Sequence, residues 1–172
     1  MDKLISERLI LRKVVREDVN SIFNNWASDP EVTKFLTWLP HESIETTNNI
    51  MDYWLEEYKN PETFRYGIVL KESNELIGMI DVVHYVDGNP EIGYCLSRKH
   101  WNKGYMSEAL DRLLKYLFSI GFKTIIIGAE HNNIASNKVI QKCGFTFTHQ
   151  ETKLCSSFKP YLVTINWYKK DR

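Results

Sequence analysis

The order of apolar and polar positions in the first third of the chain predicts one strand followed by two helices. The strand covers residues 8–14. The first helix is expected from residue 16 to residue 29, because Pro30 should end it. The second helix begins after Ser43, a favourable N-cap residue, and continues through an apolar face to residue 58. These two helices precede most of the predicted sheet.

Apolar runs predict six further strands and two further helices in the rest of the chain. The strands are expected at residues 64–70, 76–85, 91–96, 124–129, 145–153 and 161–168. An amphipathic helix with Leu110, Leu113 and Leu117 on one face is closed by Gly121, and another helix covers residues 134–142. This order of elements predicts an α+β architecture.

The composition is typical of one globular domain. The chain has 172 residues, of which 43% are hydrophobic and 26% charged. A chain of this length buries roughly 70% of its unfolded surface around one core, so we expect residues 1–172 to form a single domain. No stretch approaches ~18 consecutive apolar residues, and charged residues interrupt the N-terminus. Neither a membrane partner nor a signal peptide is therefore expected.

Cysteines and histidines give no sign of a disulfide framework or a metal centre. Cys95, Cys143 and Cys155 are an odd number without C-x-x-C spacing, which predicts reduced thiols and a cytoplasmic location. The five histidines lie far apart, without an H-x-x-x-H pair, so no metal is expected.

Charge is balanced over the whole chain but distributed unevenly. Lys plus Arg and Asp plus Glu both total 22, which disfavours a nucleic-acid partner. Residues 29–62 contain eight acidic and two basic side chains, whereas residues 95–145 contain eight basic and three acidic ones. Two solvated faces that compensate each other would explain this pattern. A cation-binding half and an anion-binding half are the alternative explanation.

Residues 96–110 carry the strongest chemical signal, since a strand end leads there through a basic loop into the start of a helix. The first turn of a helix has unpaired N–H groups and roughly half a positive charge, so it favours a bound phosphate. Gly104 lets the backbone approach such a ligand closely. One glycine is neither a dinucleotide-binding fingerprint nor a Walker A loop, and an ordinary helix cap is also compatible with this segment.

The segment Trp101-Asn-Lys-Gly-Tyr-Met-Ser-Glu-Ala109 resembles the pyrophosphate loop of the GNAT acyl-CoA-dependent N-acetyltransferases. Residues 133–136 and 142–145 resemble the next helix of that family. Residues 8–12 and 35–41 resemble the RimJ/RimL-like branch, the ribosomal-protein N-terminal acetyltransferases. The resemblance covers essentially the whole chain. It implies the GNAT acyl-CoA N-acyltransferase fold, with a mixed central sheet of about seven strands and helices on both faces.

This resemblance implies how acetyl-CoA, the acyl donor, would be bound. Backbone N–H groups from Asn102 to Ser107 would hold the pyrophosphate, and Arg98, Lys99 or Lys103 would lie near the adenosine phosphates. The strand at residues 91–96 would splay from the strand at 124–130 and leave a slot for the pantetheine arm. The implied cofactor-binding residues are Cys95, Leu96, Arg98, Asn102, Lys103, Gly104, Tyr105, Met106, Ser107, Asn133 and Ser136.

The loop departs from the general family pattern at two positions: Trp101, a residue common in this position in the RimJ/RimL-like branch, and Met106. The GNAT loop is usually written Q/R-x-x-G-x-G/A, and of these positions only Gly104 matches. Met106 stands where the family has a small residue, so its long side chain must point away from the pyrophosphate.

Acetyl transfer from a thioester to an amine also needs a proton donor for the departing thiolate. Many GNAT enzymes use a tyrosine, but Ile140 occupies that position here. RimL-like members are proposed to use a serine, which corresponds to Ser136, and a first-turn hydroxyl that only bonds its own backbone is the plainer alternative. Tyr94 is a second candidate acid.

The base and the acceptor site are less well defined by the sequence. Glu91, Glu130 and His84 are the candidate bases, acting directly or through water, and a solvated surface role fits each of them as well. The resemblance places Trp38 and His41 in the acceptor-side wall, with His84 nearby. The acidic half of the chain would attract a protonated amine.

These observations predict an acetyl-CoA-dependent N-acetyltransferase. The acetyl group would pass to a primary amine, either a protein N-terminal α-amine or a small-molecule amine, by direct transfer in a ternary complex. A catalytically silent CoA-binding regulatory module is the main alternative. An RNA- or ribosome-associated binding protein is disfavoured by the neutral charge. The family also suggests a homodimer through the last strands.

Overall fold

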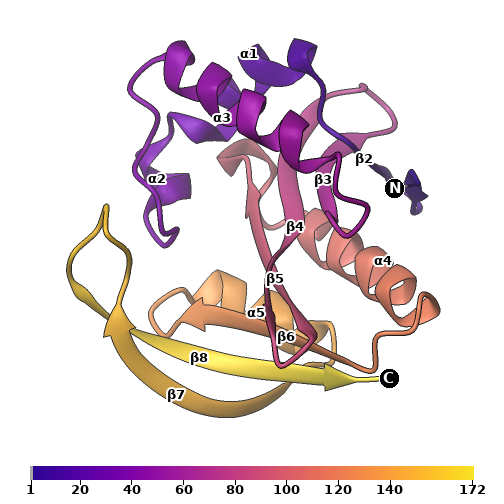
Figure 1. The fold of residues 1–172 in the computed structure, drawn as a ribbon, viewed down its shortest axis with the longest axis vertical. Helices are drawn as coiled ribbons and strands as arrows, with labels where there is room; N and C mark the ends of the chain where they lie inside the picture. The colour runs from indigo at the N-terminus through magenta and orange to yellow at the C-terminus, as the bar shows by residue number, and fades with distance from the viewer. Residues whose placement is uncertain (1) are drawn as a thin grey trace.

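One mixed sheet of eight strands organises the computed structural model, which describes residues 2–172 (Figure 1). The strands are β1 (Leu4–Ile5), β2 (Leu9–Arg12), β3 (Arg65–Leu70), β4 (Leu76–Val86), β5 (Asn89–Leu96), β6 (Thr124–Glu130), β7 (Thr146–Leu154) and β8 (Leu162–Asp171). Their order across the sheet is β1-β2-β3-β4-β5-β6-β8-β7. Only the β5–β6 pair is parallel among these strands.

The predicted mixed α+β sheet is confirmed, with eight strands instead of about seven. The additional strand is β1, which has two residues and pairs with β2. Two residues are too few to show an alternating pattern, so no sequence signal marked it.

Five α-helices cover the sheet. They are α1 (Val19–Ile22), α2 (Pro30–Thr33), α3 (Ile44–Glu57), α4 (Tyr105–Ser119) and α5 (Ile134–Lys142). The predictions of α3, α4 and α5 are confirmed, and Ser43 caps α3 by accepting a hydrogen bond from the Thr46 N–H at 3.4 Å. Among residues 2–172, no helix is both long and apolar enough to cross a membrane.

The helix predicted for residues 16–29 is present as a continuous helical segment over residues 16–27, but it is not one regular α-helix. A 3-10 turn at Arg16–Asp18 leads into α1, and a π-helix follows at Phe23–Ala27. Pro30 begins α2 instead of only ending the preceding helix, because its missing N–H costs nothing in a first helical turn. Asp29 caps this new helix by accepting from the Glu31 N–H at 2.9 Å.

Two apolar clusters lie on opposite faces of the sheet, so helices cover both faces as predicted. One cluster packs α4 and α5 against the sheet and includes Leu110, Leu113 and Ile127. The other packs α1 and α3 against the opposite face and includes Met51 and Met79. In Figure 1 α1 and α3 lie at the top of the molecule, while β7 and β8 lie at the bottom.

The parallel strands β5 and β6 separate after a short contact. They pair only at Glu91–Ile126 and Ile92–Ile127, and from Gly93 onward β5 pairs with β4 alone. The splayed strands predicted by the resemblance are therefore present. Beyond this short contact, a gap in the sheet separates β5 from β6 toward the C-terminal ends of both strands.

The loop between β7 and β8, residues 155–161, packs against the segment that follows α2. The buried Lys159 Nζ donates hydrogen bonds to the carbonyl oxygens of Thr33 at 2.7 Å, Lys34 at 3.2 Å and Leu36 at 2.8 Å. Ser156 Oγ donates to the Thr37 carbonyl. Residues more than one hundred positions apart thus form one wall.

Candidate active site

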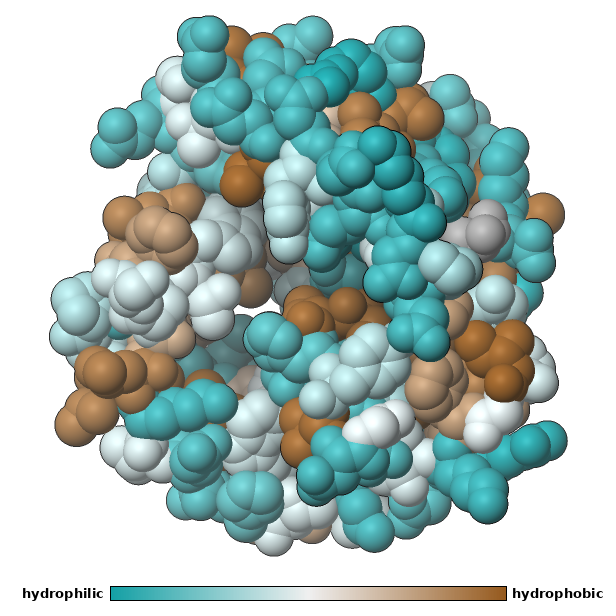
Figure 2. Space-filling model, in the orientation of Figure 1, coloured by the Kyte–Doolittle hydropathy of each residue, from teal (hydrophilic) through white to brown (hydrophobic). Residues whose placement is uncertain are grey.

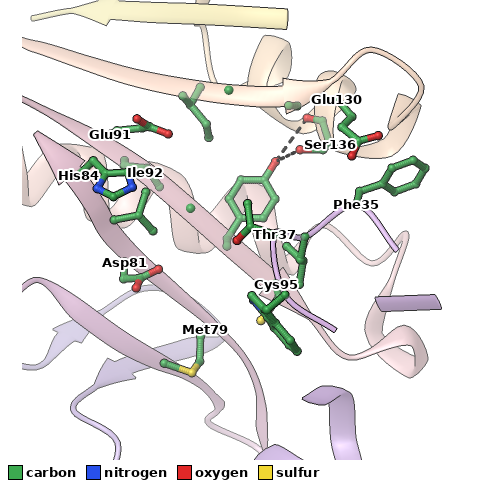
Figure 3. A pocket seen from close by; sticks show the side chains of 18 of the residues that line it. Phe35, Thr37, Met79, Asp81, His84, Glu91, Ile92, Cys95, Glu130 and Ser136 are labelled. Carbon is green, nitrogen blue, oxygen red and sulfur yellow. Dashed lines mark hydrogen bonds between the residues drawn. The ribbon is translucent and has the colours of Figure 1, made fainter. Parts of the chain in front are cut away.

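A cavity of about 520 Å³ lies where β5 and β6 separate, on the side covered by α1 and α3. Figure 2 shows the surface hollowed there, and Figure 3 shows the side chains inside. Tyr94, the second candidate acid, lines the cavity together with eight other residues predicted to act in catalysis or binding. These are Trp38, His41, His84, Glu91, Cys95, Glu130, Asn133 and Ser136.

Ser136 lies in the first turn of α5, and its hydroxyl faces the strand β5. Ser136 Oγ and the Tyr94 hydroxyl oxygen are 2.8 Å apart, and Tyr94 also lies 3.3 Å from the Ser136 carbonyl oxygen (dashed lines in Figure 3). Asn133 caps the helix by accepting from the Ser136 N–H at 3.1 Å. Burial raises the pKa of Tyr94 above its ordinary value, so the phenol is protonated throughout the neutral range.

The candidate bases lie at two separate places in the cavity. Glu91 and His84 occupy opposed positions on β5 and β4, whereas Glu130 lies near Ser136 at the end of β6 (Figure 3). Burial raises the pKa of Glu91, although His84 and Lys153 partly offset this. Burial also raises the pKa of Glu130. Both carboxyls are therefore better proton acceptors than exposed glutamates are.

The predicted acceptor-side residues Trp38 and His41 lie next to each other. Their ring centroids are 5.3 Å apart, and His41 Nδ1 is 2.8 Å from Thr47 Oγ1. Partial burial lowers the pKa of His41, which favours a neutral, uncharged ring at this wall.

An ion-pair network in the cavity wall was not predicted from the sequence. Arg65 Nε lies 3.0 Å from Asp81 Oδ2, and the same guanidinium contacts Glu57 and covers the ring of Trp54. Burial raises the pKa of Asp81 even though Arg65 opposes this. Arg65 and Asp81 are direct partners across β3 and β4, but no local motif links them, so only the strand register could have indicated the pair.

The loop before α4 presents a row of free N–H groups. Among residues 2–172, no backbone or side-chain atom accepts a hydrogen bond from the N–H groups of residues 102–107. Asn102 and Gly104 have φ angles of 59° and 80°, in the left-handed region. Met106 is only 6% exposed and packs into the core under α4. Its side chain thus points away from the loop surface, and the departure from the family pattern leaves this surface open.

Arg8 holds this loop in place, and this role of Arg8 was not predicted from the sequence. Its NH1 donates to the Lys103 carbonyl at 3.0 Å, and its guanidinium lies 4.5 Å from the centroid of the Tyr105 ring. Arg8 Nε also donates to Glu108 Oε2 at 2.7 Å, and Ser6 Oγ donates to Glu108 Oε1 at 2.7 Å. The N-terminal segment is therefore fixed to the first turn of α4.

The remaining predicted cofactor-binding residues occupy the rim of the loop. Arg98 Nε forms an ion pair with Asp29 Oδ2 at 3.2 Å and is 60% exposed. Lys99 and Lys103 are exposed. The carbonyl of Leu96 accepts a hydrogen bond from Trp101 Nε1 at 2.8 Å, so that oxygen already has one partner. Within residues 2–172, no group of three or more His, Cys, Asp or Glu side chains is arranged to hold a metal ion.

Comparison with known proteins agrees with this geometry. The acetyltransferase (GNAT) domain family matches residues 8–146. An uncharacterized N-acetyltransferase, p20 of Bacillus licheniformis, is 34% identical over 148 residues, which cover 84% of this chain and 83% of that protein. The chain therefore belongs to the GNAT acetyltransferase family, and it is an N-acetyltransferase.

Solved structures share the fold over nearly the full length. A GNAT-family acetyltransferase from Bacillus anthracis superposes with a TM-score of 0.85 at 27% identity, covering 99% of this chain and 98% of that one. RimL, a ribosomal L7/L12 alpha-N-protein acetyltransferase in complex with coenzyme A, superposes with a TM-score of 0.86 at 20% identity, with the same coverage. The resemblance to the RimL-like branch is thus confirmed for the fold.

Proposed function

We propose that this enzyme transfers the acetyl group of acetyl-CoA directly to a primary amine in a ternary complex. One observation carries the proposal: the cavity between the separated strands β5 and β6 contains a hydroxyl pair and two carboxyls with raised pKa values. Such a cavity can admit a thioester from one side and an amine from the other.

In this proposal the donor lies along the loop before α4. The free N–H groups of residues 102–107 bind the pyrophosphate together with the positive end of the helix. Arg98, Lys99 and Lys103 lie near the adenosine phosphates. The backbone of Cys95 and Leu96 and the side-chain amide of Asn133 bind the pantetheine arm.

The transfer needs no covalent enzyme intermediate. Burial raises the pKa of the Cys95 thiol to about 12, so at neutral pH this thiol is protonated and is not a nucleophile. The neutral amine adds to the thioester carbonyl and forms a C–N bond. The C–S bond then breaks with its electron pair on sulfur, which takes the proton of Ser136 Oγ. Ser136 recovers a proton that the acceptor nitrogen releases through water.

Deprotonating the acceptor is the role proposed for Glu91 or Glu130, acting through water. At pH 7 the removal of a proton from an α-amine of pKa ~7.8 costs about 1 kcal/mol, against about 4.6 kcal/mol for a lysine of pKa ~10.4. No strong base is evident among the lining residues, so an N-terminal α-amine or another weakly basic amine suits this site better than lysine. Trp38, His41 and His84 would contact it.

We further propose that residues 1–172 act as one acetyltransferase domain in the cytoplasm. A homodimer through the last strands is compatible with β7, which is the outer strand of the sheet and is exposed along its whole length.

The test is the release of CoA thiol from acetyl-CoA in the presence of N-terminal peptides, small amines such as polyamines and aminoglycosides, free amino acids and lysine peptides. We expect turnover with an α-amine or small-amine class and none with lysine peptides. Ser136→Ala should lose about 10²-fold in kcat, the usual size of a general-acid contribution, while its CoA affinity stays unchanged. CoA binding by the wild type without turnover on any acceptor would favour the silent CoA-binding module.

A further inference from the structure

The hydroxyl of Ser136 has a single hydrogen-bond partner. Among the atoms of residues 2–172, only the Tyr94 hydroxyl lies within hydrogen-bond distance of Ser136 Oγ, at 2.8 Å. A serine in the first turn of a helix commonly donates its proton to a carbonyl three or four residues earlier. Ser136 makes no such bond.

Asn137 explains why the nearest of those carbonyls is unavailable. The Asn133 carbonyl accepts from the Asn137 N–H at 3.1 Å and from Asn137 Nδ2 at 2.7 Å, which fills both of its lone pairs. The buried Asn137 is itself fixed, because its Oδ1 accepts from Asn166 Nδ2 at 2.8 Å and from the Tyr168 hydroxyl at 2.6 Å. The start of α5 is therefore built so that the Ser136 hydroxyl turns toward β5.

We propose that Tyr94 is a positioning residue, whose hydroxyl donates to Ser136 Oγ and so directs the serine proton into the cavity. This inference rests on the proposed role of Ser136 as proton donor. Tyr94 has one proton and two acceptors within reach, Ser136 Oγ at 2.8 Å and the Ser136 carbonyl oxygen at 3.3 Å. The shorter distance favours Oγ.

The direction of this bond decides whether Ser136 can act. A hydroxyl has one donor and two acceptor positions. If Tyr94 donates to Oγ, the serine proton has no acceptor among residues 2–172 and is free to reach the leaving sulfur. If the serine donated to Tyr94 instead, its proton would be held in the wall. Burial keeps the phenol protonated, so Tyr94 remains a hydrogen-bond donor over the working pH range.

The functional test compares Tyr94→Phe, Ser136→Ala and the double variant in kcat and in KM for acetyl-CoA. Tyr94→Phe should lower kcat by about 10-fold, less than a full general-acid contribution, and leave KM unchanged. The double variant should be no slower than Ser136→Ala, because Tyr94 acts only through that serine. Tyr116→Phe is the matched control. Tyr116 lies on α4, packs against Phe64 and does not line the cavity.

Several outcomes separate this inference from the proposed function. If Ser136→Ala is impaired and Tyr94→Phe is not, or if the two effects multiply in the double variant, Tyr94 does not act through Ser136. If Ser136→Ala turns over as fast as the wild type, the proposed role of the serine is wrong.

A crystal structure of Tyr94→Phe decides the positioning role without turnover. We expect the Ser136 side chain to leave its present orientation, because the variant offers no partner to Ser136 Oγ and the Asn133 carbonyl is already occupied by Asn137. An unchanged orientation of Ser136 in the variant would overturn the proposal. This test does not require that the acceptor be known.

Discussion

Replacing Arg8 with alanine should weaken the binding of CoA without slowing the loaded enzyme. Arg8 touches the loop before α4 twice, through the Lys103 carbonyl and the ring of Tyr105. Both contacts hold the loop in the shape that leaves its N–H groups free. Without them, the ligand has to order the loop as it binds.

The magnitude follows from these two contacts. A hydrogen bond contributes about 1 kcal/mol net, and an exposed cation–π contact contributes about 0.5 to 1 kcal/mol. If CoA binding must supply the free energy of both lost contacts, about 1.5 to 2 kcal/mol, the Kd for CoA rises by roughly 10- to 30-fold. The ion pair of Arg8 with Glu108 adds little, because the Arg8 side chain is 44% exposed and water screens it.

Isothermal titration with CoA measures this change directly, and Arg112→Ala is the control. Arg112 Nε donates to the Ile5 carbonyl at 3.0 Å, so it also fastens the N-terminal segment to α4 but does not touch the loop. Both variants should lower Tm, whereas only Arg8→Ala should raise Kd. An equal rise of Kd in both variants would mean that general loosening of the N-terminal segment causes the effect. An unchanged Kd in Arg8→Ala would refute the role of Arg8.

Two further predictions concern charged groups. Arg65→Met should lower the free energy of unfolding by roughly 3 kcal/mol, because it leaves Asp81 and Glu57 without a counter-charge in a partly buried site. Urea unfolding at pH 7 measures this change. A variant as stable as the wild type would contradict the prediction. The pKa of Glu108 is lowered because hydrogen bonds from Arg8 and Ser6 outweigh the opposing effect of burial, so its contribution is present above the ordinary glutamate pKa and is lost as the pH falls through the folded value. The stability difference between pH 7 and pH 4 should therefore be smaller in Glu108→Gln than in the wild type, and an equal difference would show that Glu108 contributes nothing.

The elements that could be predicted are those with a local signal. The N-cap Ser43, the apolar face of α4 and the glycine Gly121 that closes α4 each act within a few residues, and both helices have the expected extents. The sequence predicted a helix from residue 16 to 29 but not its division into a 3-10 turn, an α-helical turn and a π-helix. Trp26 is buried inside the π-helix.

The candidate site follows the same rule. Ser136, Asn133 and the loop around Gly104 belong to short motifs, and the sequence indicated them. Arg8 and Glu108 meet across 100 positions. Lys153 and Trp167 reach the cavity from β7 and β8, and neither residue type is unusual in a strand. Contacts of this kind depend on strand order, which periodicity does not encode.

The docking of Lys159 on the segment after α2 also has a consequence for protein synthesis. Strand β8 lies between β6 and β7, and the loop before it completes the wall formed by residues 33–37. A nascent chain therefore cannot close the cavity until residues 155–171 have left the ribosome. This wall of the cavity is consequently completed late, although residues 33–37 are synthesised early.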